Sequence, residues 1–173
     1  MVASLVAVHA DSLKGVQLEV RAGEVRGIAG VEGNGQHDLA LVLSGRKSPS
    51  LGRADIPKEV AFIPQDRHAE GLVADFDLTE NVALALSRME EFGPSVMMPW
   101  GVLRDEAERI RTRFEVVAPS TETRARFLSG GNQQRVIIGR ELALNAPMLV
   151  VENPTRGLDV AAAAYVHGEL LKL

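Results

Sequence analysis

A glycine-rich stretch between an apolar run and a helical pattern constrains the fold of this chain more than any other feature. Residues 25–29 are apolar enough for a short strand, residues 30–35 read GVEGNG, and an apolar helical pattern begins at Leu39. A strand, a glycine loop and a helix in this order are the layout of a phosphate-binding P-loop. The sequence therefore predicts an α/β domain organised around this loop.

The side chains that follow the loop do not supply the usual P-loop chemistry. The pattern G-x-x-x-x-G-K-[ST] puts a lysine on the phosphates and a hydroxyl on Mg²⁺, whereas this chain has Gln36 and His37. Glu32 and Asp38 add two carboxylates near the phosphate position. Losing the lysine alone should weaken binding roughly tenfold to a hundredfold. A glycine turn kept only for strand-to-helix geometry is the open alternative. The candidate nucleotide-binding residues are Gly30, Val31, Glu32, Gly33, Asn34, Gly35, Gln36 and His37.

A second glycine loop, LSGGNQQR at residues 128–135, runs straight into the apolar segment 136–144. It predicts a helix N-terminus with little side-chain bulk, where unpaired backbone N–H groups and the helix dipole attract an anion. Ser129 adds a hydroxyl, and Gly130 and Gly131 allow a phosphate to approach the backbone closely. An ordinary N-capped helix would use the same residues, so the loop alone leaves both interpretations open.

Three further segments fit strands. Residues 5–20 contain short apolar runs with clear alternation from Val16 onward, and residues 59–63 place apolar side chains on one face. Residues 147–151, PMLVV, form a short apolar run bounded by turn signals, which favours a buried strand. The polar, turn-rich segment 46–57 is predicted to be a loop.

From Asp77 the apolar period changes from two to about 3.6 residues. Asp77 or Thr79 can cap a first helix that extends through Met89, and residues 103–114 carry the apolar stripe of a second. Residues 91–99, rich in Met, Pro and Gly, are predicted to link the two helices.

Charge and composition limit the function classes. Asp105 with Arg109 and Glu108 with Arg111 have helical spacing, which indicates a solvated, salt-bridged face. A nucleic-acid patch of arginines is the alternative, and the interleaved acids and a net charge of −4 disfavour it. The 173 residues suit one domain, the absence of cysteine excludes disulfides and thiolate metal sites, and no apolar run has the length of a membrane span.

The octapeptide LSGGNQQR resembles the signature motif of ATP-binding-cassette (ABC) ATPases. Its ending NQQR and the segment DRHAEGLV at residues 66–73 are similar to the versions found in importers of simple sugars and nucleosides. The resemblance implies ATP and Mg²⁺ as cofactors. It also implies that Ser129, Gly130, Gly131 and Gln133 act in trans, on phosphates held by a partner domain in a head-to-tail dimer.

The same resemblance implies roles for four more residues. Gln65 corresponds to the Q-loop glutamine, which touches the metal and the attacking water and links the nucleotide site to the membrane subunit. Glu152 stands where an aspartate holds the magnesium-bound water, and Asn153 stands where a glutamate polarises the attacking water. A carboxamide accepts no proton at neutral pH, and losing a general base typically lowers a rate by about 10² to 10⁴. Asp159 is expected in the D-loop at the dimer interface and as N-cap of a last helix. No confident metal ligand set results, and Mg²⁺, if bound, is expected near His37, Gln65 and Glu152.

The chain departs from the family pattern at both ends. A domain of this type would continue to another buried strand that ends in a switch histidine. Residues 1–173 are therefore expected to be a single nucleotide-binding domain that is incomplete at its C-terminus, with a helical subdomain inserted at about 75–128. The first aromatic residue is Phe62, so the early aromatic that usually stacks on adenine is missing. Stacking would have contributed about 1 to 3 kcal/mol.

These features together predict an α/β, P-loop NTPase core of the ABC type with an antiparallel β portion and an inserted α-helical subdomain. The expected function is that of an importer's nucleotide-binding domain, degenerate in its own ATP site and inactive in isolation. It would supply its signature to a second nucleotide-binding domain of the same polypeptide. It would lie in the cytoplasm on the inner face of the membrane, held by transmembrane permease subunits. A slow ABC ATPase with a rearranged site and a soluble, non-transport ABC module are the alternatives.

Overall fold

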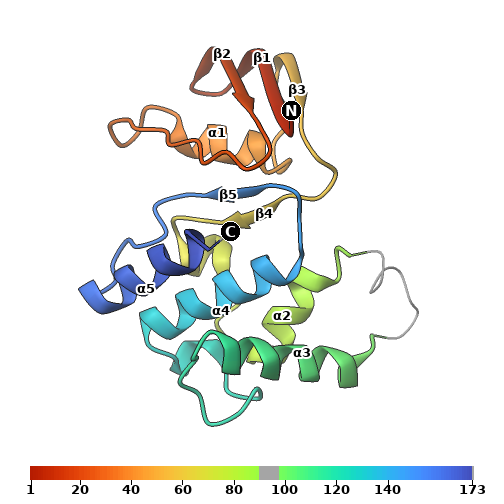
Figure 1. Cartoon of the computed structure of the whole chain (residues 1–173), viewed down its shortest axis with the longest axis vertical. Helices are drawn as coiled ribbons and strands as arrows, with labels where there is room; N and C mark the ends of the chain where they lie inside the picture. Colours follow the sequence, from red (N-terminus) through yellow and green to blue (C-terminus); the bar gives the residue numbers. More distant parts are fainter. Residues whose placement is uncertain (90–97, 173) are drawn as a thin grey trace. The chain divides into compact units, whose positions relative to one another are not determined.

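The computed structural model of this chain describes residues 1–89 and 98–172. The chain forms two compact units, Met1–Phe62 with Ala146–Glu152 and Ile63–Asn145 with Asn153–Leu173. Figure 1 traces the elements of both units in chain order. A mixed α/β architecture with an antiparallel sheet and a helical subdomain confirms the predicted fold class. The predicted link at 91–99 lies outside the described residues except for positions 98 and 99.

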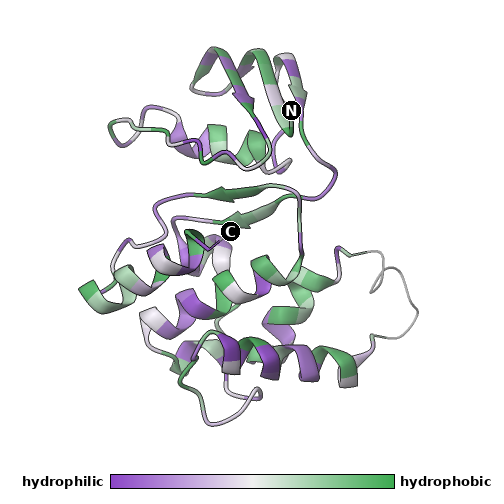
Figure 2. Cartoon of the chain, viewed as in Figure 1, coloured by the Kyte–Doolittle hydropathy of each residue, from purple (hydrophilic) through white to green (hydrophobic). Residues whose placement is uncertain are grey.

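The first unit is built on a three-stranded antiparallel sheet. β1 (Ala3–Ala10) pairs with β2 (Leu13–Val20) on one edge and with β3 (Leu51–Asp55) on the other. The glycine loop leads into α1 (Gln36–Leu43), and β4 (Ala61–Ile63) pairs with β5 (Leu149–Val151). Figure 2 shows apolar colour along β4 and β5. The core gathers buried side chains from β1, β2, α1, β4 and β5, among them Leu5, Val8, Leu39, Val42, Phe62 and Val150, and β3 adds the partly buried Ala54.

Two segments of this unit differ from the sequence prediction. Residues 25–29, predicted as a strand, have no regular structure, and Val25 is 90% exposed. Within the described residues this segment pairs with no strand, and its side chains are exposed to solvent. Residues 51–55, predicted as part of a loop, form β3 because they pair with β1. Their side chains are mostly exposed, so the sequence has no apolar alternation that would indicate a strand.

The second unit is helical. The one-turn π-helix η1 (Arg67–Gly71) precedes α2 (Leu78–Leu86) and α3 (Trp100–Arg113). The 3₁₀ turn η3 (Ala125–Phe127) then leads into α4 (Gly130–Ala143), and α5 (Val160–Leu170) follows β5. α2, α3 and α4 pack on one another through buried residues such as Val82, Leu103, Ile110 and Ile137. Among the described residues, no helix is both long and apolar enough to cross a membrane.

Local side-chain chemistry fixes the helix starts of this unit. Asp77 forms a reciprocal capping box with Glu80 at the start of α2, which decides between the two predicted caps. Thr79 is buried and lies inside the helix. The charges of α3 form the predicted salt-bridged face, with Arg111 paired to Glu108 at 2.6 Å. Arg109 pairs with Glu106 at 3.0 Å and not, as predicted, with Asp105.

Candidate functional site

In the first unit, the Gln36 side chain bonds back to the glycine loop that precedes it. Gly33 and Gly35 adopt φ angles of 89° and 94°, which favour glycine, and turn the chain into α1. The Gln36 side chain folds back and donates from Nε2 to the carbonyl oxygen of Val31 at 2.8 Å. A Cβ on Gly30 would lie 2.4 Å from the same Nε2. The room that Gly30 leaves is therefore filled by the Gln36 amide.

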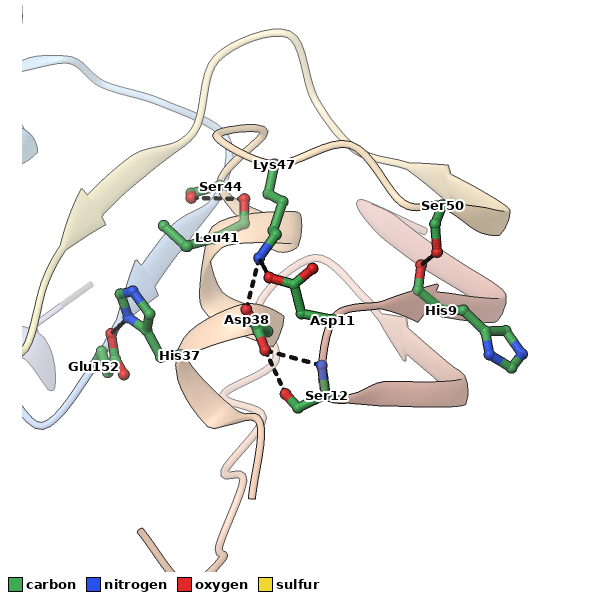
Figure 3. Close-up of polar contacts among 10 residues, drawn as sticks. All are labelled: His9, Asp11, Ser12, His37, Asp38, Leu41, Ser44, Lys47, Ser50 and Glu152. Atoms are coloured by element: carbon green, nitrogen blue, oxygen red, sulfur yellow. Dashed lines mark hydrogen bonds and ion pairs between the residues drawn. The ribbon is translucent and has the colours of Figure 1, made fainter. Parts of the chain in front are cut away.

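The residue after Gln36 is paired as well. The Nδ1 atom of His37 lies 3.0 Å from Oε2 of Glu152, which follows β5 (Figure 3). The Glu152 side chain is 8% exposed, whereas that of His37 is 48% exposed. The structure thus brings together two residues predicted to lie near a metal. Mg²⁺ prefers oxygen ligands, and the position of the P-loop hydroxyl that would ligate it is taken here by an imidazole paired with Glu152. This pair does not fit the magnesium site of a working P-loop.

The Asp38 carboxylate was expected near the phosphate position, but it bonds to other residues of the first unit. Its carboxylate accepts from Lys47 Nζ at 2.8 Å and from both the backbone and the hydroxyl of Ser12 (Figure 3). The Lys47 contact, followed by that of Ser12, lowers the pKa of Asp38 to about 2. Lys47 also pairs with Asp11. The negative charge at Asp38 is therefore balanced within the unit and ties α1 to the β1–β2 turn. Lys47 belongs to no motif, and nothing in the sequence marked it.

In the second unit, two further candidate residues meet. Asn153 donates from Nδ2 to Oε1 of Gln65, which lies between β4 and η1. Asn153 has a φ of 41°, a conformation that asparagine tolerates better than most residues. The carboxamide at this position is thus a hydrogen-bond donor to the predicted Q-loop residue. It offers no proton acceptor for general-base chemistry.

The signature loop starts α4, as predicted. Ser129 is the N-cap, and its exposed hydroxyl accepts from the backbone N–H of Asn132 at 3.4 Å and from Nδ2 of the same residue at 3.0 Å. Gly130 and Gly131 follow and are half-buried. Gln133 is 6% exposed and donates to the carbonyl of Ala125 at 3.0 Å. Gln133 therefore supports the loop from inside, and the exposed residue of the motif is Ser129.

A residue that the sequence did not single out lies against this loop. The Arg67 guanidinium is so close to Gly130 that a Cβ there would lie 2.9 Å from Nη2. Its Nη1 donates to the backbone carbonyl of Arg156 at 3.1 Å. Arg67 is the second residue of DRHAEGLV, but the motif's spacing gives no sign of these contacts.

The last residue of the octapeptide is structural. Arg135 donates from Nη1 to the carbonyls of Phe114 and Glu115 at 2.9 and 3.0 Å, where α3 ends. Its guanidinium lies 3.9 Å from the centroid of the Tyr165 ring on α5. Asp159 caps α5 by accepting from the N–H of Ala162 at 2.8 Å, which confirms its predicted N-cap role. The signature helix is thereby tied to the end of α3 and to the helix that follows Asp159.

Comparison with known proteins gives this geometry a family context. A family model described as ABC transporter matches residues 13–156. The chain is 37% identical to the guanosine import ATP-binding protein NupO of Bacillus subtilis (strain 168), covering 94% of this chain and 34% of that protein. It is 36% identical to the nucleoside import ATP-binding protein NupA of Lactococcus lactis subsp. cremoris (strain MG1363), covering 92% and 34% respectively. The chain thus spans about a third of the length of these curated relatives.

A solved structure supports the fold independently. The ATP-binding cassette MJ0796, solved as a dimer in a post-hydrolysis state with ADP and Pi, matches with a TM-score of 0.80. The match covers 99% of this chain and 82% of that chain. The sequence identity is 24%, so the match supports the fold alone.

Proposed function

Because the chain belongs to the ABC transporter family, we propose that it is a nucleotide-binding domain of an importer for nucleosides or simple sugars. Its own ATP loop is degenerate, and its signature loop serves the ATP site of a partner domain. ATPases of this family bind ATP with Mg²⁺. The substrate class rests on the names of the relatives, which import guanosine and nucleosides.

One observation carries the proposed division of labour. In the glycine loop, the Gln36 amide bonds to Val31, and His37 faces Glu152, so both side chains that would meet MgATP have partners inside the chain. At the signature, Ser129 at the start of α4 is exposed. A domain that serves a partner's nucleotide needs the second feature and tolerates the first.

The signature would act by binding and orientation. The Ser129 hydroxyl and the backbone N–H groups at the start of α4 can donate to the γ-phosphate oxygens of a nucleotide held by the partner. The positive end of the helix dipole adds to this attraction. ATP supplies the phosphoryl group, and no step of its hydrolysis is assigned to Asn153, which lacks a proton acceptor and bonds to Gln65.

The partners follow from the same proposal. A second nucleotide-binding domain would lie in the same polypeptide, which the relatives' length supports because about two thirds of each lies outside the match. Transmembrane permease subunits would hold the assembly on the cytoplasmic face of the membrane, and they would select the substrate.

Two substitutions test the proposal in the complete transporter. Gly130→Asp places bulk and negative charge at the start of α4, where a Cβ lies 2.9 Å from Arg67 Nη2 and where the partner's phosphate would dock. We expect ATP hydrolysis to fall on the order of a hundredfold or more, as for loss of a transition-state anion donor. Gln36→Ala should leave the rate nearly unchanged.

Gly101→Asp is the matched control, because a side chain at this position in the first turn of α3 meets nothing within 4 Å. It should retain wild-type hydrolysis. Equal losses for Gly130→Asp and Gln36→Ala, or a larger loss for Gln36→Ala, would reverse the division of labour between the two loops.

A further inference from the structure

Arg67 lies where three segments of the second unit meet. It opens η1, its guanidinium lies against Gly130 at the start of α4, and its Nη1 donates to the carbonyl of Arg156 at 3.1 Å. Gly157 is the next neighbour, since a Cβ there would lie 3.8 Å from Nη2. A single side chain thus touches the signature loop and the segment that leads to Asp159.

The position of this guanidinium is not explained by charge. Across residues 1–89 and 98–172, no carboxylate forms a salt bridge with Arg67, and its buried Nε has no hydrogen-bond partner. A cation at a helix N-terminus is also opposed by the helix dipole. One hydrogen bond, to the backbone carbonyl of Arg156, holds the side chain there. Its contact with both loops is therefore the feature to be explained.

We propose that Arg67 is a positioning residue for the partner's ATP site. It holds the start of α4 against residues 156–157, so that the signature and the segment before Asp159 present one fixed surface. The proposal rests on the proposed function, in which that surface completes a partner's nucleotide site. It adds a second reason for glycine at position 130, which admits the Arg67 guanidinium as well as a phosphate.

The geometry makes Gly130 and Arg67 act as one unit. A Cβ at 130 would lie 2.9 Å from Nη2, closer than real Cβ contacts come, and 3.3 Å from Cζ, which is tighter than most. The guanidinium is the flexible end of its side chain, so it would move aside without unfolding the loop. We expect this displacement to weaken the bond from Nη1 to Arg156, which is the interaction that removing the guanidinium abolishes. Gly130→Ala and Arg67→Ala should therefore disturb the same interaction.

A double-mutant cycle in the complete transporter tests this coupling. We expect Arg67→Ala and Gly130→Ala each to lower kcat for ATP hydrolysis about tenfold, the effect of losing one charged hydrogen bond. The double mutant should be no slower than the slower single mutant. Independent effects would multiply to about a hundredfold, and that result would overturn the proposal.

Further variants separate positioning from a general structural role. The thermal unfolding temperature should stay near that of wild type in all three mutants, and KM for ATP should change less than kcat. Arg67→Lys keeps the charge but has no planar fork to span both loops, so full activity of this variant would also refute the proposal. Arg109→Ala, on the exposed face of α3, is the matched control and should be silent.

Failure of this inference is distinguishable from failure of the proposed function. If Gly130→Asp leaves hydrolysis intact, the signature does not serve a partner's site and the proposed function fails. If Gly130→Asp abolishes hydrolysis while the cycle is multiplicative, the signature acts in trans without Arg67, and only the inference about Arg67 fails.

Discussion

Replacing Asp38 with asparagine tests how the glycine-loop helix is anchored. The carboxylate accepts from Lys47 at 2.8 Å and from the backbone N–H of Ser12 at 3.2 Å. Asparagine keeps the size of the side chain and one acceptor oxygen, so the substitution mainly removes the charge. The contact between α1 and the β1–β2 turn should weaken while the fold is kept.

The pKa of Asp38 gives the size of the effect. Lys47 first, and Ser12 second, lower this pKa from 3.8 to about 2, and a difference of that size corresponds to at most about 2.4 kcal/mol. Solvent screens the pair, because 18% of the Asp38 side chain and 26% of the Lys47 side chain are exposed. We therefore expect Asp38→Asn to lower the free energy of unfolding at pH 7 by about 1 kcal/mol.

The sign of the pH dependence follows from the lowered pKa. A carboxyl group whose folded pKa lies below its unfolded pKa stabilises the fold above the unfolded value, near pH 4. That stabilisation is lost as the pH falls through the folded value of about 2. The difference between wild type and Asp38→Asn should be constant from neutral pH down to about pH 5 and then shrink.

Urea denaturation of the chain at several pH values measures this difference. Asp105→Asn is the control, because Asp105 is exposed on α3 and its loss should leave the midpoint unchanged. Two results would refute the reasoning. One is an Asp38→Asn protein as stable as wild type at pH 7, and the other is a stability gap that persists unchanged near pH 2.

Two further predictions concern the nucleotide. Calorimetry on this chain should give a dissociation constant for MgATP no tighter than the high micromolar range, because Gln36 and His37 already have partners. A low-micromolar constant would show that nucleotide displaces both contacts easily. Gln36→Lys alone should not restore hydrolysis, since Asn153 still lacks a proton acceptor. Turnover by this single mutant, measured as phosphate release, would mean that another group is the base.

The parts of the fold that local chemistry decides were predictable. Asp77 and Asp159 cap their helices as expected, because an N-cap acts within three residues of itself. Strands depend on partners elsewhere in the chain, and there the prediction was wrong in both directions. Residues 25–29 have the composition of a strand without a neighbour, whereas residues 51–55 have little strand pattern but lie beside β1.

The candidate site was predictable in its residues but not in its contacts. The sequence shows that Gln36 and His37 replace a lysine and a hydroxyl. It does not show that Gln36 turns back to Val31 or that His37 finds Glu152, 115 positions away. Arg67 was missed for the same physical reason. A single long side chain that bridges two loops leaves no periodicity or spacing in the sequence.

The hydrogen bond between Gln36 and Val31 has a consequence for how the order of the glycine loop depends on bound nucleotide. A loop that becomes ordered only around phosphate shifts its folding equilibrium with nucleotide concentration, by mass action. Here the Gln36 side-chain amide bonds to the loop, and because it belongs to the same chain its effective concentration is fixed. The part of the loop's order that this bond supplies therefore does not depend on nucleotide concentration.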